Sequence, residues 1–227
     1  MVFYPNLENM SNFSNITGVL SIITGIIFWI GIPRGYSKSL FSAQKVINFP
    51  VLLLGITALC LSVGLTTVLS HYFPGLHSTQ SEELLQLMND PVGITIVVIL
   101  VLFFAPLAEE FLFRGVLIDG ACVFLRQKPN VATLLSATLF ALSHGITHFP
   151  GGFLFAFCLG LMRIRTQSIR GTAFVHGLNN LFGLGVLYYQ SGDIPLALAY
   201  GMVVTGGVGL TYLLLSTQAL SKPEQDA

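Results

Sequence analysis

Hydrophobic residues form seven long runs along the chain, at residues 16–33, 50–70, 92–118, 132–149, 152–166, 171–190 and 195–216. Because a helix of about 20 residues crosses the hydrocarbon core of a bilayer, each run predicts a membrane-spanning helix. The fifth run is short. The third continues to Arg126 and is too long for one span unless it bends or protrudes, and Pro106 is the expected place for a bend.

The basic residues support this map and give it an orientation. Nine of the ten lysines and arginines fall on the same side of a seven-helix chain, whereas the segments on the other side carry acids and neither Lys nor Arg. Since cytoplasmic loops are rich in Lys and Arg, we expect the N-terminus outside and the C-terminus in the cytoplasm. The prediction is one all-α, multi-pass membrane bundle over residues 1–227, in the cell membrane if the host is a bacterium or an archaeon.

The composition agrees with lipid as the main solvent. Hydrophobic residues make up 53% of the chain and charged residues 9%, against roughly 25% charged in soluble domains, which excludes an ordinary water-soluble enzyme. Ten basic residues balance ten acidic ones, so we expect no nucleic-acid partner. Cys60, Cys122 and Cys158 stand singly in apolar stretches and are expected to be small core residues.

Three charged residues interrupt the third hydrophobic run: Glu109, Glu110 and Arg114. Each costs about 2.5 to 3.5 kcal/mol at the centre of a membrane helix, so the cluster needs compensation. Glu110 and Arg114 are four residues apart, acid first, which favours an ion pair on one helix face. Glu109 is rotated by about 100° and has no built-in partner, so it is the expected general base. A buried network that ties helices together is the structural alternative.

Two later runs carry polar pairs at helical spacing. Phe140 and His144 share one helix face, and His176 and Asn180 share another. Each pair alone is explained equally well by hydrogen bonds between helices. Together with Glu109 they supply a base, imidazoles and an amide, the groups that activate a water and stabilise an oxyanion. Asn179 lies about 100° from Asn180 around the same helix and is its control position.

In this order, the three patterns resemble the CAAX protease and bacteriocin-processing family (CPBP, or Abi), which includes the Ras-converting CAAX endopeptidases. Residues 109–114 match its EExxxR motif, 140–144 its FxxxH motif and 176–180 its HxxxN motif, and no motif residue departs. The resemblance covers about residues 92–190, the expected catalytic core.

The resemblance implies an intramembrane endopeptidase that acts on a membrane-associated or lipidated peptide or protein. It implies that Glu109 and His144 activate water and that His176 and Asn180 hold the oxyanion. Glu110, Arg114 and Phe140 would support the site. We expect no metal cofactor, because a zinc ion held by Glu109, His144 and His176 would leave no spare general base, although zinc stays open as the alternative.

Two further polar residues have weaker claims on this site. His148 follows His144 by four residues and could join a zinc site, but its neighbours place it at a turn. Asp119 is expected to be a polar residue near the inner interface.

Several alternatives stay open at the level of the sequence. A proton-coupled transporter also carries intramembrane charges, although the chain shows no internal repeat. A non-enzymatic immunity or scaffold protein would keep the fold and tolerate loss of Glu109. The substrate and the oligomeric state are undetermined.

The depths of the site residues conflict on this map. Counted along the expected helices, Glu109 and His176 lie nearer the inner surface than His144 does. Either the fourth helix starts after Val131, or the helices are offset so that these groups meet.

Overall fold

The computed structural model describes residues 49–73, 88, 91–145, 148–188 and 194–220. In these ranges the chain forms helices joined by turns and contains no strand, which confirms the all-α class. Six predicted runs correspond to helices here, and the first, 16–33, lies outside the described residues. The count of seven spans stays a prediction.

The helices follow the hydrophobic runs closely. The second run forms α3 (Phe49–Tyr72), and the last three form α9 (Phe149–Thr166), α10 (Arg170–Tyr188) and α11 (Leu196–Leu220). The third run is a series of α5 (Pro91–Ile99), the π-helical η2 (Leu100–Phe104), α6 (Ala105–Glu110), the π-helical η3 (Phe111–Leu117) and α7 (Ile118–Phe124). The fourth run forms α8 (Pro129–Ser143).

Three of the described helices are long and apolar enough to cross a membrane: Val51–Tyr72, Pro91–Phe124 and Leu196–Leu215. The distribution of apolar and charged side chains is the reverse of that in a soluble protein. Large apolar side chains such as Phe103, Phe174 and Val204 are exposed, whereas Glu110 and Arg114 are buried. Apolar residues outside and charges inside are what a lipid solvent selects, because lipid cannot hydrate a charge. The chain is an integral membrane protein.

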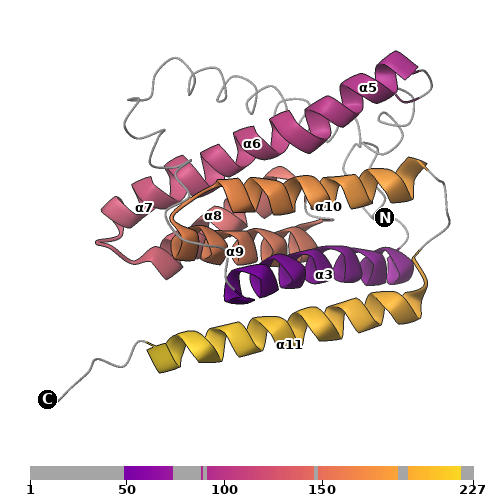
Figure 1. Cartoon of the computed structure of the whole chain (residues 1–227). Helices are drawn as coiled ribbons and strands as arrows, with labels where there is room; N and C mark the ends of the chain where they lie inside the picture. Colours follow the sequence, from indigo (N-terminus) through magenta and orange to yellow (C-terminus); the bar gives the residue numbers. More distant parts are fainter. Residues whose placement is uncertain (1–48, 74–87, 89–90, 146–147, 189–193, 221–227) are drawn as a thin grey trace, which may run out of the picture.

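The helices pack as a bundle around α3 and α9. Helix α11 lies along α3, α3 along α9, and α9 along α8, while α10 joins the α5–α7 run to α9 and α3 (Figure 1). Small residues permit these contacts. A Cβ built on Gly64 of α3 would lie 2.8 Å from the backbone oxygen of Ala199 in α11, so glycine is needed for the two backbones to come this close.

Pro106 does not interrupt the third run, which is helical over 34 residues from Pro91 to Phe124. At 1.5 Å per residue this is about 50 Å, longer than the hydrocarbon core of about 30 Å. The π-helical turn of η2 directly precedes Pro106, so one extra residue per turn accommodates the missing proline N–H. Beyond α7, Arg126 and Gln127 adopt left-handed conformations (φ of 55° and 64°) and turn the chain back into α8.

The expected limits of the fourth helix are wrong at both ends. Helix α8 begins at Pro129 and ends at Ser143, because His144 leaves the helical conformation and Gly145 has a φ of +88°. Its 15 residues span about 22 Å. The helix therefore does not start after Val131. Instead it ends early, which places His144 at its C-terminus, and the offset of the helices brings the motif residues together.

Candidate active site

Glu110 and Arg114 form the ion pair that their spacing predicts. The Nη1 atom of Arg114 lies 3.0 Å from Oε1 of Glu110, and both side chains are fully buried. Nη2 of Arg114 also donates to the backbone oxygen of Ala156 in α9, at 3.4 Å. The pair thus joins the α6–η3 junction to α9, as the structural reading of these charges expected.

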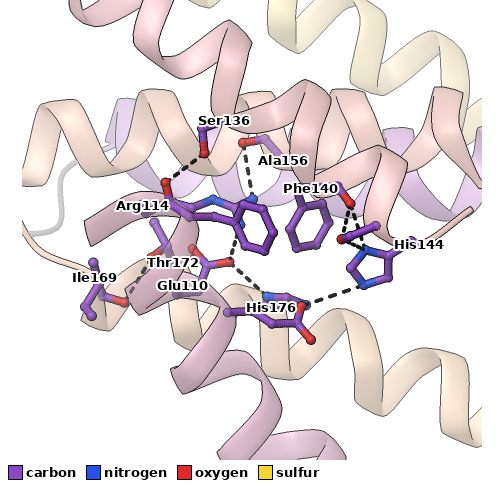
Figure 2. A network of polar contacts seen from close by, with 12 residues as sticks. Glu110, Arg114, Ser136, Phe140, His144, Ala156, Ile169, Thr172 and His176 are labelled. Atoms are coloured by element: carbon purple, nitrogen blue, oxygen red, sulfur yellow. Dashed lines mark hydrogen bonds and ion pairs between the residues drawn. The ribbon is translucent and has the colours of Figure 1, made fainter. Parts of the chain in front are cut away.

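Glu110 has a second partner that the sequence does not reveal. Its Oε1 atom lies 2.9 Å from Nδ1 of His176 on α10. Figure 2 shows Glu110 between Arg114 and His176, so one carboxylate bridges a guanidinium and an imidazole. This contact depends on how α6 and α10 are rotated about their axes, and the chain spacing carries no signal for it.

Glu109 faces the two motif histidines. Its Oε2 atom lies 3.7 Å from Nε2 of His144 and 3.7 Å from Nε2 of His176. Both distances exceed the length of a direct hydrogen bond, yet they are short enough for the three atoms to contact the same small molecule. The residue without a partner on its own helix therefore has two on other elements, at the end of α8 and on α10.

The tautomers of both histidines follow from their other nitrogen. Nδ1 of His144 lies 2.9 Å from the backbone oxygen of Phe140, which can only accept a hydrogen bond, so Nδ1 carries the proton. Nδ1 of His176 likewise donates to Glu110. In the neutral rings the lone pairs of both Nε2 atoms then point toward Glu109, an orientation fixed by second partners.

Phe140 orients the same groups by ring contacts. Its ring centroid lies 4.5 Å from the guanidinium carbon of Arg114 and 4.4 Å from the centroid of His144. The ring lies between these two residues (Figure 2). His176 meets it edge-on at 5.6 Å. An aromatic residue four positions before His144 therefore separates the buried ion pair from the imidazole and restrains both.

Asn180 contacts the helix that contains Pro106. Its Nδ2 atom donates to the backbone oxygen of Val101, at 2.9 Å. That oxygen lies five residues before Pro106, which has no N–H to offer it. The backbone oxygen of the next residue, Leu102, faces Gly177, where a Cβ would lie 2.8 Å away. Helix α10 therefore closes over the π-helical turn, with the Asn180 amide on one freed oxygen.

A cavity of about 140 Å³ opens beside these residues. The side chain of His144, which lines the cavity, is 39% exposed. Asn179 lines the cavity together with Asn180, so it is not the remote control position expected from its rotation. The wall also contains residues of α3, α8, the α8–α9 turn, α9 and α10: Ser62, Thr66, Phe140, His144, His148, Gly152, Phe155 and His176.

The two residues with weaker claims occupy different places. His148 precedes α9 and lines the cavity, as a residue at a turn. Asp119 pairs with Arg163 of α9, Oδ2 to Nη2 at 3.2 Å, so it joins α7 to α9. Within the described ranges, no group of three or more His, Cys, Asp or Glu residues has the geometry of a metal site.

Residues 91–182 match the Rce1-like family, described as type II CAAX prenyl endopeptidase Rce1-like. This match supports the resemblance seen in the three motifs and limits it to residues 91–182. All the motif residues lie in the Rce1-like segment, whereas α3 and α11 lie outside it. No curated protein and no solved structure matches the chain. The Rce1-like family implies a peptide hydrolase of the membrane.

Proposed function

We propose that the chain is an intramembrane endopeptidase that hydrolyses a peptide bond of a membrane-associated or lipidated protein. One observation carries this proposal: the Glu109 carboxylate lies 3.7 Å from the Nε2 atoms of both His144 and His176, beside a cavity. The Rce1-like match supports a prenylated peptide as the substrate class. The lipid part of such a substrate would keep it at the bilayer, where the enzyme lies.

In the proposed reaction Glu109 is the general base. A water between Glu109 and His144 gives a proton to the carboxylate, and its oxygen attacks the carbonyl carbon of the scissile bond. The neutral His144 ring orients that water through Nε2, because Nδ1 is held by Phe140. When the tetrahedral intermediate collapses, the C–N bond breaks and the protonated Glu109 returns its proton to the leaving amine.

His176 and Asn180 are proposed to stabilise the oxyanion. To donate from Nε2, His176 must carry a proton on each ring nitrogen, and the Glu110 carboxylate accepts the Nδ1–H and so holds the ring in place. The second N–H of the Asn180 amide remains for the substrate while the first is directed at Val101. Glu110 and Arg114 act through His176 as positioning residues.

This mechanism uses the chain's own base and is proposed to need no metal. A zinc ion would have to take Glu109, His144 and His176 as ligands. Glu110 would then be the remaining acid in the cluster, and its Oε1 already contacts Arg114 and His176. A catalytic zinc site normally keeps a separate base beside its ligands, so this donor set fits a glutamate mechanism better.

The proposal is tested in living membranes. Cells that produce the intact chain and cells that produce Glu109→Gln at the same level are compared by mass spectrometry of peptide termini in membrane proteins. We expect termini that occur only with the intact chain. Identical sets of termini would contradict proteolysis and favour a non-enzymatic role for the same fold.

A further inference from the structure

Besides His148, three polar side chains in the cavity have no part in the proposed chemistry. Asn179 comes from α10, and Ser62 and Thr66 come from successive turns of α3. The two histidines of the site line the same cavity. A molecule in this cavity that contacts His144 and His176 therefore lies close to these three residues as well.

Asn179 has a buried polar atom that a bound molecule could satisfy. Its Oδ1 atom is buried and has no hydrogen-bond partner among the described residues. A buried amide oxygen left in this state is costly, and such atoms normally have a partner in the protein or in what binds to it. Since Asn179 lines the cavity, a bound molecule with an N–H group can supply that partner.

The wall from α3 is held close to the site by a tight helix contact. A Cβ built on Gly151, in the first turn of α9, would lie 2.7 Å from Oγ1 of Thr66 and 3.1 Å from the backbone oxygen of Ser62. Glycine is therefore required for α3 to approach α9 at this level. The contact sets the position of the Thr66 hydroxyl relative to the cavity.

The size and lining of the cavity select the part of a substrate that fits. Its 140 Å³ corresponds to the volume of roughly five waters, well below the 300 Å³ or more of pockets for drug-sized ligands. This volume fits a short stretch of peptide main chain better than a prenyl chain together with its peptide. The walls carry amides, hydroxyls and imidazoles, which match the alternating N–H and C=O groups of a peptide main chain.

We infer that Asn179, with Thr66 and Ser62, forms a subsite that binds the main chain of the substrate next to the scissile bond. Oδ1 of Asn179 accepts a substrate N–H, and the α3 hydroxyls bind the neighbouring peptide group. The inference rests on the proposed function and adds positioning residues to it. Because α3 lies outside the Rce1-like segment, part of this subsite comes from outside the matched residues.

The test uses the full chain in lipid nanodiscs and a synthetic peptide with a prenylated cysteine followed by three residues. Asn179→Leu removes the polar atoms at similar volume, Thr66→Val removes the hydroxyl at the same shape, and Thr66→Ser is the conservative control. Analogues of the peptide replace single main-chain amides near the scissile bond by esters, which deletes one N–H at a time.

We expect Asn179→Leu and Thr66→Val to raise KM by about ten- to a hundredfold, the effect of one lost buried hydrogen bond, with little change in kcat. Thr66→Ser should resemble the wild type. One ester analogue should raise the KM of the wild type by a similar factor. The same analogue should raise the KM of Asn179→Leu little further. Asn180→Ala should instead lower kcat.

An unchanged KM in both variants would overturn the subsite, and so would an ester analogue that raises KM equally in the wild type and in Asn179→Leu. Cleavage of the peptide by the wild type would still uphold the proposed function. If the wild type does not cleave the peptide and the Glu109→Gln variant does not bind it, both proposals fail. If Asn179→Leu does not fold, the KM of Thr66→Val and the ester scan of the wild type test the subsite, because both experiments leave Asn179 in place.

Discussion

Glu110 shows how one residue can have two tasks in a membrane helix. It is paired with Arg114 at 3.0 Å and with His176 at 2.9 Å through the same oxygen. The first contact compensates a buried cation and the second fixes the imidazole that faces Glu109. Glu110, which was expected only to support the fold, therefore contacts His176, a residue with a direct role in the proposed reaction.

We predict that Glu110→Gln lowers both stability and turnover. Removing one partner of a buried ion pair costs about 3 to 5 kcal/mol, because the remaining charge stays buried. The neutral amide is also a weaker acceptor for the Nδ1–H of His176, so the imidazole is held less firmly. Thermal unfolding in detergent and kcat per folded molecule measure the two effects. A stable Glu110→Gln protein with normal kcat would contradict this reading.

The metal content of the purified protein distinguishes the glutamate mechanism from a zinc mechanism. If Glu109 and His144 handle the water themselves, elemental analysis of the purified protein should give far less than one transition-metal ion per chain. Activity should survive prolonged chelation. Stoichiometric zinc, with activity lost on chelation and restored by zinc, would make Glu109, His144 and His176 ligands.

At the scale of elements, the close contact between α10 and η2 positions the site. Pro106 has no N–H for the backbone oxygen of Val101, which accepts from the Asn180 amide instead, and Gly177 of α10 packs against the next oxygen, that of Leu102. His176 lies next to Gly177 in the chain. A change in the distance between these two helices therefore moves the imidazole relative to Glu109.

We predict that Gly177→Ala lowers turnover by tenfold or more and destabilises the protein by about 1 to 3 kcal/mol, the usual effect of overpacking. The added Cβ would lie 2.8 Å from the backbone oxygen of Leu102. Gly183→Ala is the matched control on the same helix, because a Cβ there meets nothing within 4 Å. Equal activity of the two variants would show that the contact does not position the site.

The sequence predicts the elements and the motif residues well, but not how they meet. Hydrophobic runs place most helices to within a few residues, and the spacing of Glu110 and Arg114 predicts their ion pair correctly. The end of α8 was missed, because residues 144–149 continue a hydrophobic run while Gly145 turns the backbone. The bond from Glu110 to His176 and the place of Asn179 in the cavity depend on helix rotation, which spacing within one helix does not encode.

At the scale of the whole molecule, the bundle provides a polar site inside an apolar surface. The Rce1-like segment supplies Glu109 and the histidines, while α3 closes the cavity from outside that segment. The orientation of this bundle in the membrane decides from which side a substrate peptide enters. The distribution of basic residues predicts that orientation.

We predict a cytoplasmic C-terminus. Green fluorescent protein fused after Ala227 should fluoresce in bacterial cells, whereas alkaline phosphatase fused at the same point should be inactive, because each reporter works on only one side of the membrane. The reverse result would invert the orientation and with it the seven-span map.

The central claim is that Glu109 is the general base of peptide hydrolysis, and kcat of Glu109→Gln in nanodiscs tests it most directly. The amide has the same shape but cannot take a proton from water. With the prenylated peptide as substrate, we expect the purified wild type to cleave it and Glu109→Gln to bind it with a similar Kd and show no turnover. Turnover by Glu109→Gln at a rate close to that of the wild type would contradict the account.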